Sequence, residues 1–126
     1  MPEQTILVVD DDPSITNVLE LLLGMEQYKV LTARNGEEGI ALAKRVQPDL
    51  ILMDILMPEL NGHMASTMIK ADPATKHIPI ILLTATAQMA GNIAIDGNAI
   101  FTIHKPFEPE ELVAKINEVL KNQLSL

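Results

Sequence analysis

The chain has 126 residues, 48% of them hydrophobic and only 2% aromatic, which suits one domain with a core of aliphatic side chains. The absence of Cys excludes disulfides, thiolate chemistry and cysteine-ligated zinc, and the formal net charge of −8 argues against direct binding of DNA or RNA. No apolar run approaches the roughly 18 residues of a membrane span. Met1 to Gln4 also lack the basic start of a secretory signal. We therefore expect a soluble, cytoplasmic protein that does not contact a membrane.

Short apolar runs alternate with segments of helical periodicity along the chain. The runs predict five strands, at residues 5–10, 29–33, 50–54, 80–84 and 99–103. An alternation of strands and helices predicts an α/β fold, here a (βα)5 doubly wound, flavodoxin-like parallel sheet with strand order 2-1-3-4-5. We expect residues 1–126 to form this single domain and to contain no second one.

Helix boundaries are marked by capping residues. Asp12 is the expected N-cap of the first helix, with Pro13 at its first position and Gly24 at its end. Asn35 is the expected N-cap of the second. The remaining helices are expected at residues 62–71, at 85–98 as a short or frayed helix, and from Glu108 onward.

Polar side chains stand where four of the expected strands end. They are Asp10, Asp11, Asp54, Thr84 and Lys105. The carboxyl ends of parallel strands share one edge of the sheet, which is where open α/β sheets bind their ligands. Each of these residues alone has a structural interpretation, such as a helix N-cap for Asp10 or Asp11. Together, three carboxylates, a hydroxyl and an ammonium predict a site for a divalent cation and a phosphoryl group.

The three carboxylates of this edge are candidate metal ligands. Neighbouring carboxylates repel each other, and a hard cation removes that conflict. Mg²⁺ is typically held by one or two carboxylates together with phosphate oxygens and water. We expect Asp11 and Asp54 to bind it directly and Asp10 to act through water. The backbone carbonyl of Leu56 could complete the protein ligands.

Asp54 is also the expected nucleophile. A carboxylate can attack a phosphoryl group and form an aspartyl phosphate. In such a reaction Lys105 would supply a second positive charge, and Thr84 would donate its hydroxyl hydrogen to a phosphoryl oxygen.

These residues and their neighbours match a known family in type, order and approximate spacing. The matching segments are Val8-Val9-Asp10-Asp11, Met53-Asp54, Met57-Pro58, Gly62, Leu83-Thr84-Ala85 and Lys105-Pro106-Phe107. Over essentially its whole length the chain resembles the receiver domains of response regulators, the phosphorylatable modules of two-component signalling. The resemblance implies one receiver domain over residues 1–126, with no effector domain in this chain.

The resemblance also implies a function and partners. Asp54 would accept a phosphoryl group, with Mg²⁺, from a phosphohistidine on a sensor histidine kinase or histidine phosphotransfer protein. The chain would be a signalling phosphoacceptor rather than an enzyme, and it would act on a downstream protein through the face of the fourth helix, fifth strand and fifth helix, which can also form a homodimer. The candidate residues for docking on the kinase are Ile15, Val18, Met57, Pro106 and Phe107.

The chain departs from the family pattern at the switch residue of the fifth strand. The family's aromatic lies three residues before the lysine, where this chain has Thr102. Phe101 lies one place earlier and should point to the opposite face of the sheet because side chains alternate along a strand. A small bulge would return Phe101 to the usual face.

Three other functions are compatible with parts of the pattern. A flavodoxin-like FMN carrier would share the fold, but Asp10-Asp11-Asp12-Pro13 would repel its phosphate. A haloacid-dehalogenase-type phosphatase usually has a second Asp two residues after its nucleophile, where this chain has Leu56. A pseudo-receiver, used for docking alone and with an altered output, is the third.

Overall fold

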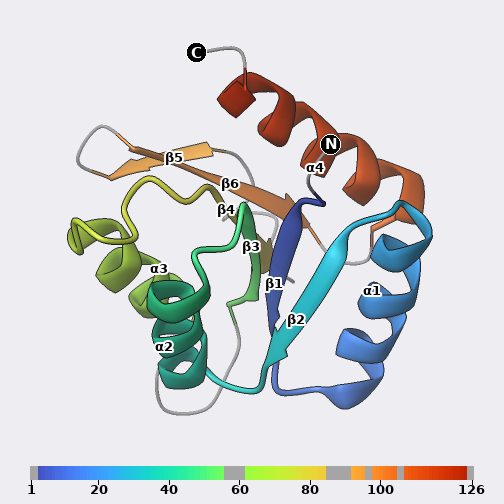
Figure 1. Ribbon diagram of the computed structural model, residues 1–126, viewed down its shortest axis with the longest axis horizontal. Helices are drawn as coiled ribbons and strands as arrows, with labels where there is room; N and C mark the ends of the chain where they lie inside the picture. The colour runs from blue at the N-terminus through green and yellow to red at the C-terminus, as the bar shows by residue number, and fades with distance from the viewer. Residues whose placement is uncertain (1–2, 56–61, 85–91, 96–97, 105–106, 125–126) are drawn as a thin grey trace.

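The computed structural model describes residues 3–55, 62–84, 92–95, 98–104 and 107–124, which form one sheet with helices on both of its faces (Figure 1). The strands are β1 (Thr5–Val9), β2 (Lys29–Ala33), β3 (Leu50–Asp54), β4 (Ile80–Thr84), β5 (Asn92–Ile95) and β6 (Asn98–His104). The helices are α1 (Pro13–Met25), α2 (Gly36–Val46), α3 (Gly62–Ala71) and α4 (Pro109–Leu124).

The sheet has the order β2-β1-β3-β4-β6-β5, and its first five members pair in parallel. This confirms the predicted order 2-1-3-4-5, with β6 in the place of the expected fifth strand. Successive residues of β1 alternate between two cores: Ile6 and Val8 pack with α1 and α4, and Leu7 and Val9 pack with α2 and α3. The sheet is therefore covered on both faces, as a doubly wound fold requires.

The expected capping residues begin the first two helices. The Asp12 side chain accepts the Ser14 backbone N–H at 3.0 Å, and Asn35 Oδ1 accepts the Glu38 backbone N–H at 2.8 Å. Gly24 does not end α1, contrary to expectation. The helix continues to Met25 and ends at its C-cap, Glu26.

The expected helix at residues 85–98 is wrong for the part of it that the structure describes. Asn92–Ile95 form β5, which pairs antiparallel with β6, with Ile95 opposite Asn98. Ile93 and Ile95 are β-branched and favour strands, and the two residues between Ile95 and Asn98 are Asp-Gly, the sequence typical of a two-residue hairpin connection. Residues 85–91 and 96–97 lie outside the described part of the chain.

None of the helices in the described residues is both long and apolar enough to cross a bilayer.

Candidate functional site

Asp10 and Asp11 follow directly after β1. The backbone N–H of Asp10 donates to the carbonyl of Ala33 at 3.0 Å, which continues the pairing of β1 with β2 by one residue. The Asp10 side chain is buried, and its Oδ1 accepts the backbone N–H of Asp12 at 2.9 Å. Asp11, in contrast, is exposed to solvent. The turn into α1 thus holds one carboxylate inside the site and one at its mouth.

Asp54 is the last residue of β3 and is only 8% exposed. The chain around it is tightly held, because the Ile55 N–H donates to the Leu83 carbonyl at 3.1 Å and the Gly62 N–H donates to the Ile55 carbonyl at 3.0 Å. A Cβ atom on Gly62 would lie 2.2 Å from the carbonyl oxygen of Asp54. Gly62 is therefore required by the close approach of α3 to the end of β3, which gives a physical reason for its place in the motif.

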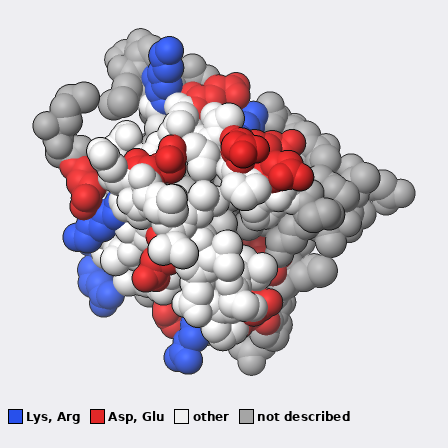
Figure 2. Space-filling model, turned by 90° about the vertical axis from the view of Figure 1, so that its right-hand side faces the viewer, with Lys and Arg blue, Asp and Glu red and all other residues white. Residues whose placement is uncertain are grey.

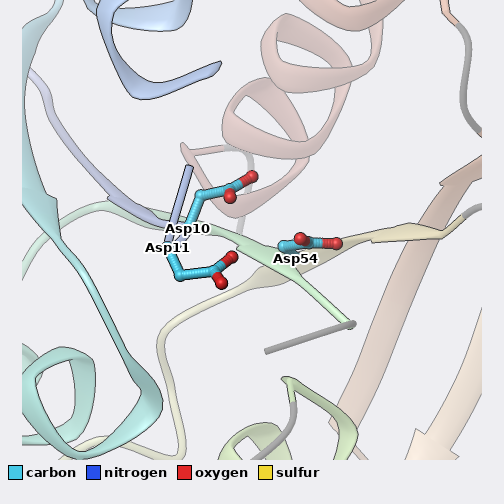
Figure 3. Close-up of side chains that lie close together, drawn as sticks. All are labelled: Asp10, Asp11 and Asp54. Carbon is cyan, nitrogen blue, oxygen red and sulfur yellow. The ribbon is translucent and has the colours of Figure 1, made fainter. Parts of the chain in front are cut away.

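The three carboxylates come together at the carboxyl edge between β1 and β3. One oxygen from each of Asp10, Asp11 and Asp54 lies within 4.8 Å of the others. Figure 3 shows the side chains next to one another, two from the end of β1 and one from β3. At this spacing the negative charges repel unless a proton or a cation intervenes. A donor set of three carboxylate oxygens suits a hard divalent cation such as Mg²⁺, which prefers oxygen ligands.

The other residues predicted for the site are placed in part. Thr84 is the last residue of β4 and pairs with His104 of β6, so its backbone reaches the same edge, while its side chain is not described. β6 ends one residue before Lys105. Lys105 and Leu56 lie outside the described residues.

The pairing of β6 with β4 shows whether Phe101 is moved to the face of the sheet on which the family's aromatic lies. β4 and β6 pair without interruption from Ile80 opposite Ile100 to Thr84 opposite His104. The suggested bulge is therefore wrong. Phe101 packs on the core shared with α1 and α4, and Lys115 Nζ of α4 lies 4.9 Å from its ring centroid. Thr102 is buried and occupies the next position of the strand, so the predicted alternation of these two side chains is confirmed.

Two of the predicted docking residues, Met57 and Pro106, lie outside the described residues. Ile15 and Phe107 are half-buried, and Val18 is 62% exposed on α1. The sequence analysis did not select Leu21 and Met25, which are 70% and 73% exposed on the same helix. Their spacing of three and seven residues from Val18 is the signal that could have identified them. Figure 2 shows this side of the molecule, where residues other than Lys, Arg, Asp and Glu cover most of the centre and side chains of both charges lie around them.

Comparisons with known proteins agree with the fold and the acidic cluster. Residues 6–117 match the family of response regulator receiver domains. The chain is 37% identical over 117 residues to the DNA-binding dual master transcriptional regulator RpaA of Synechocystis sp.. The matched region covers 92% of this chain and 48% of that protein. The chain spans about half the length of the first curated relatives that it matches.

Solved structures give the same result. A CheY-like response regulator receiver domain protein from Methanospirillum hungatei superimposes with a TM-score of 0.85 at 27% identity, covering 98% of each chain. The receiver domain of the sensor histidine kinase PA1611 from Pseudomonas aeruginosa superimposes with a TM-score of 0.79 at 30% identity, covering 99% of this chain and 100% of that one. That structure has a magnesium ion coordinated in its active-site cleft.

The fold, the acidic cluster and the family match together define a phosphoacceptor module of two-component signalling. The chain belongs to the response regulator receiver domain family.

Proposed function

We propose that Asp54 is the residue that accepts the phosphoryl group. The observation that carries this proposal is the position of its carboxylate at the end of β3, within 4.8 Å of carboxylate oxygens of Asp10 and Asp11. In the transfer, an Asp54 oxygen forms a bond to phosphorus while the bond between phosphorus and the donor breaks, and the donor leaves with the bonding electron pair. The donor is a phosphohistidine of a sensor histidine kinase or of a histidine phosphotransfer protein.

The acidic cluster would hold Mg²⁺, with Asp11 and Asp54 as direct ligands, Asp10 acting through water and the carbonyl of Leu56 as a further ligand. The bound ion supplies positive charge that offsets the negative charge of the phosphoryl oxygens. The magnesium ion in the active-site cleft of the PA1611 receiver domain supports the binding of Mg²⁺ at the acidic cluster. Lys105 would form an ion pair with a phosphoryl oxygen, and Thr84 would donate a hydrogen bond to another.

We further propose that residues 1–126 act as one receiver domain in the cytoplasm and signal to a downstream protein, without catalysing a reaction on a separate substrate. RpaA is named as DNA-binding. For this domain we propose no direct contact with DNA, because its net charge of −8 would repel the phosphate backbone. Val18, together with Leu21 and Met25, offers apolar surface for docking of the kinase.

The output surface would differ from the expected helix–strand–helix face. Asn92–Ile95 form a strand, so the described part of this surface consists of β5, β6 and α4. Phe101 is held below α4 by the core and by Lys115. We therefore propose that phosphorylation acts on this surface without inward rotation of an aromatic at position 102.

The test is incubation with acetyl phosphate and Mg²⁺, followed by intact mass spectrometry. We expect addition of one phosphoryl group to the wild-type chain and none to Asp54→Asn. Asp49→Asn is the matched control, because it makes the same change just before β3, at the opposite edge of the sheet, where the Asp49 side chain accepts the Thr5 N–H. It should label like the wild type. Labelling of Asp54→Asn would move the acceptor to another residue and overturn the proposal.

A further inference from the structure

α3 crosses one face of the sheet from the carboxyl edge to the amino edge. It begins at Gly62, beside the end of β3, and it ends at Ala71, ahead of β4. The 10 residues of this helix span about 15 Å. A shift of α3 along its own axis therefore moves its two ends relative to opposite edges of the sheet.

The first residue of α3 lies against the backbone of the proposed phosphoryl acceptor. The Gly62 N–H donates to the Ile55 carbonyl at 3.0 Å. A Cβ atom on Gly62 would lie 2.2 Å from the carbonyl oxygen of Asp54 and 2.9 Å from its carbonyl carbon. Because the contact is this close, the position of α3 determines where the backbone that carries the Asp54 carboxylate can lie.

The other end of α3 is anchored by a buried lysine. Lys70 is 4% exposed, and its Nζ donates to the carbonyls of Lys76 at 3.1 Å and Ile78 at 2.6 Å. Thr75 adds a bond in the reverse direction, from its Oγ1 to the carbonyl of Ile69 at 2.8 Å. These bonds tie the last turn of α3 to the connection that leads into β4.

Between its ends, α3 packs on the core largely through small side chains. Ala65, Ser66 and Ile69 are each 0% exposed, and two of these three side chains are small. Small side chains interlock little with their neighbours, and packed helices can slide past one another by about 1–2 Å. We therefore expect the directional hydrogen bonds of Lys70 to fix the position of α3 along its axis.

Stability alone does not explain an ammonium group at this position. Burial disfavours the charged form of Lys70 and lowers its pKa to about 8. Buried ionic groups can often be replaced by apolar side chains of similar volume without loss of stability, and some are kept because they define one arrangement of the structure. The arrangement that Lys70 defines is the position of α3 relative to β4.

We propose that Lys70 is a positioning residue for Asp54, and that it acts through α3. Lys70 holds the helix where Gly62 lies against the Asp54 carbonyl, and so keeps the Asp54 carboxylate oriented towards the phosphoryl donor. Orientation strongly affects rate, since a misplacement of about 1 Å can lower it about 100-fold. This inference rests on the proposed function, because the reaction that Lys70 supports is the phosphorylation of Asp54.

The test is the rate constant of labelling by acetyl phosphate at saturating Mg²⁺, followed by intact mass spectrometry. Lys70→Met keeps a similar length and removes both hydrogen bonds. It should lower the rate constant at least about tenfold and leave the half-saturating concentration of acetyl phosphate nearly unchanged. Asp72→Asn is the matched control at the same end of α3. It weakens the ion pair with Lys44 at 3.1 Å, leaves the bonds of Lys70 in place and should label at the wild-type rate.

A double-mutant cycle shows whether Lys70 acts through the position of α3. Gly62→Ala forces the helix away from Asp54, because the new Cβ would otherwise lie 2.2 Å from the carbonyl oxygen. With the anchor removed, the helix can move to accept this atom. The decrease in rate caused by Gly62→Ala should therefore be at least about threefold smaller in Lys70→Met than in the wild type. Residues that act independently would give effects that multiply.

Circular dichroism shows whether each variant is folded. If Lys70→Met does not fold, Lys70→Gln replaces it, because the shorter side chain can donate to the same carbonyls only if α3 shifts. If Gly62→Ala does not fold, the comparison of the Lys70 variant with Asp72→Asn decides. Equal rates for the wild type and the Lys70 variant overturn this inference alone, and so do effects that multiply in the cycle. A wild type that is not labelled overturns the proposed function and this inference with it.

Discussion

At the amino edge of the parallel sheet, charged side chains meet backbone groups of opposite polarity, whereas at the carboxyl edge three carboxylates face one another. At the amino edge Asp49 Oδ2 accepts the Thr5 N–H at 2.7 Å. Lys70 Nζ donates to the carbonyls of Lys76 at 3.1 Å and Ile78 at 2.6 Å. These contacts hold the segments that lead into β1 and β4.

At the carboxyl edge, side chains of the same charge lie close together. The carboxylates of Asp10, Asp11 and Asp54 lie within 4.8 Å of one another, and two of them are buried. Like charges in such a site lower the stability of the native state unless a cation is bound. We expect from this difference that the contacts of the amino edge stabilise the fold, while the carboxylates of the carboxyl edge are placed to bind a cation.

The largest expected effect concerns Lys70 at the amino edge. The side chain is only 4% exposed, and this burial lowers the pKa of Lys70 to about 8 from 10.5. Below pH 8 both the folded and the unfolded chain keep the proton. Between pH 8 and 10.5 the unfolded chain keeps the proton that the folded chain has released, so stability rises with pH. We expect the free energy of unfolding to increase by about 1–2 kcal/mol from about pH 7.5 to about pH 9.5.

Urea unfolding of the wild type and of Lys70→Met measures this contribution. Methionine has a similar length and does not titrate, so the free energy of unfolding of Lys70→Met should stay nearly constant over the same pH interval. The interval ends below pH 10 because burial raises the pKa of Tyr28 above its usual value of 10.0, and its titration acts in the opposite direction. If the free energy of unfolding of Lys70→Met rises equally, another group causes the pH dependence, and Lys70 does not contribute to it.

The effect of Mg²⁺ on thermal stability tests the carboxyl edge. A cation that binds the folded carboxylate cluster and not the unfolded chain stabilises the protein by about 1.4 kcal/mol at ten times its dissociation constant. We expect this gain in the wild type and in Asp49→Asn, and a much smaller gain in Asp11→Asn. Thermal unfolding with and without Mg²⁺ measures it. Identical melting curves for the wild type would contradict the metal site.

The sequence allowed most of the fold and the acidic cluster to be predicted, because the strands and caps carry local signals and the order of the strands brings their carboxyl ends together. The buried strands are short apolar runs, and the caps Asp12 and Asn35 are recognisable from their side chains alone. Asp10, Asp11 and Asp54 were placed together by strand order, since parallel strands end at one edge. The opposite orientation of Phe101 and Thr102 followed from the two-residue period of a strand.

Two features escaped prediction for physical reasons. In β5 the Gly and Asn residues of the surrounding segment favoured a frayed helix, while the β-branched Ile93 and Ile95 and the hairpin signal after them decided the outcome. The burial of Lys70 left no trace in the sequence, because its hydrogen-bond acceptors are the backbone carbonyls of residues 76 and 78. Such acceptors belong to every residue and form no pattern.

The smallest expected effect comes from replacing one Asp with Asn at each edge of the sheet. Without Mg²⁺, Asp10→Asn should raise the free energy of unfolding by about 1 kcal/mol, because it removes one of three like charges. The new amide keeps an oxygen that can accept the Asp12 N–H. Asp49→Asn should lower stability by up to about 1 kcal/mol, because a neutral acceptor replaces the carboxylate bonded to Thr5.

Urea unfolding of both variants with and without Mg²⁺ gives the full comparison. Saturating Mg²⁺ should reverse the sign for Asp10→Asn, because the wild-type cluster then gains binding energy that the variant lacks. The effect of Asp49→Asn should be the same under both conditions. A clear loss of stability in Asp10→Asn without Mg²⁺ would mean that Asp10 is held by a structural partner whose attraction exceeds the repulsion from Asp11 and Asp54. Repulsion among the three carboxylates would then not be what distinguishes the carboxyl edge from the amino edge.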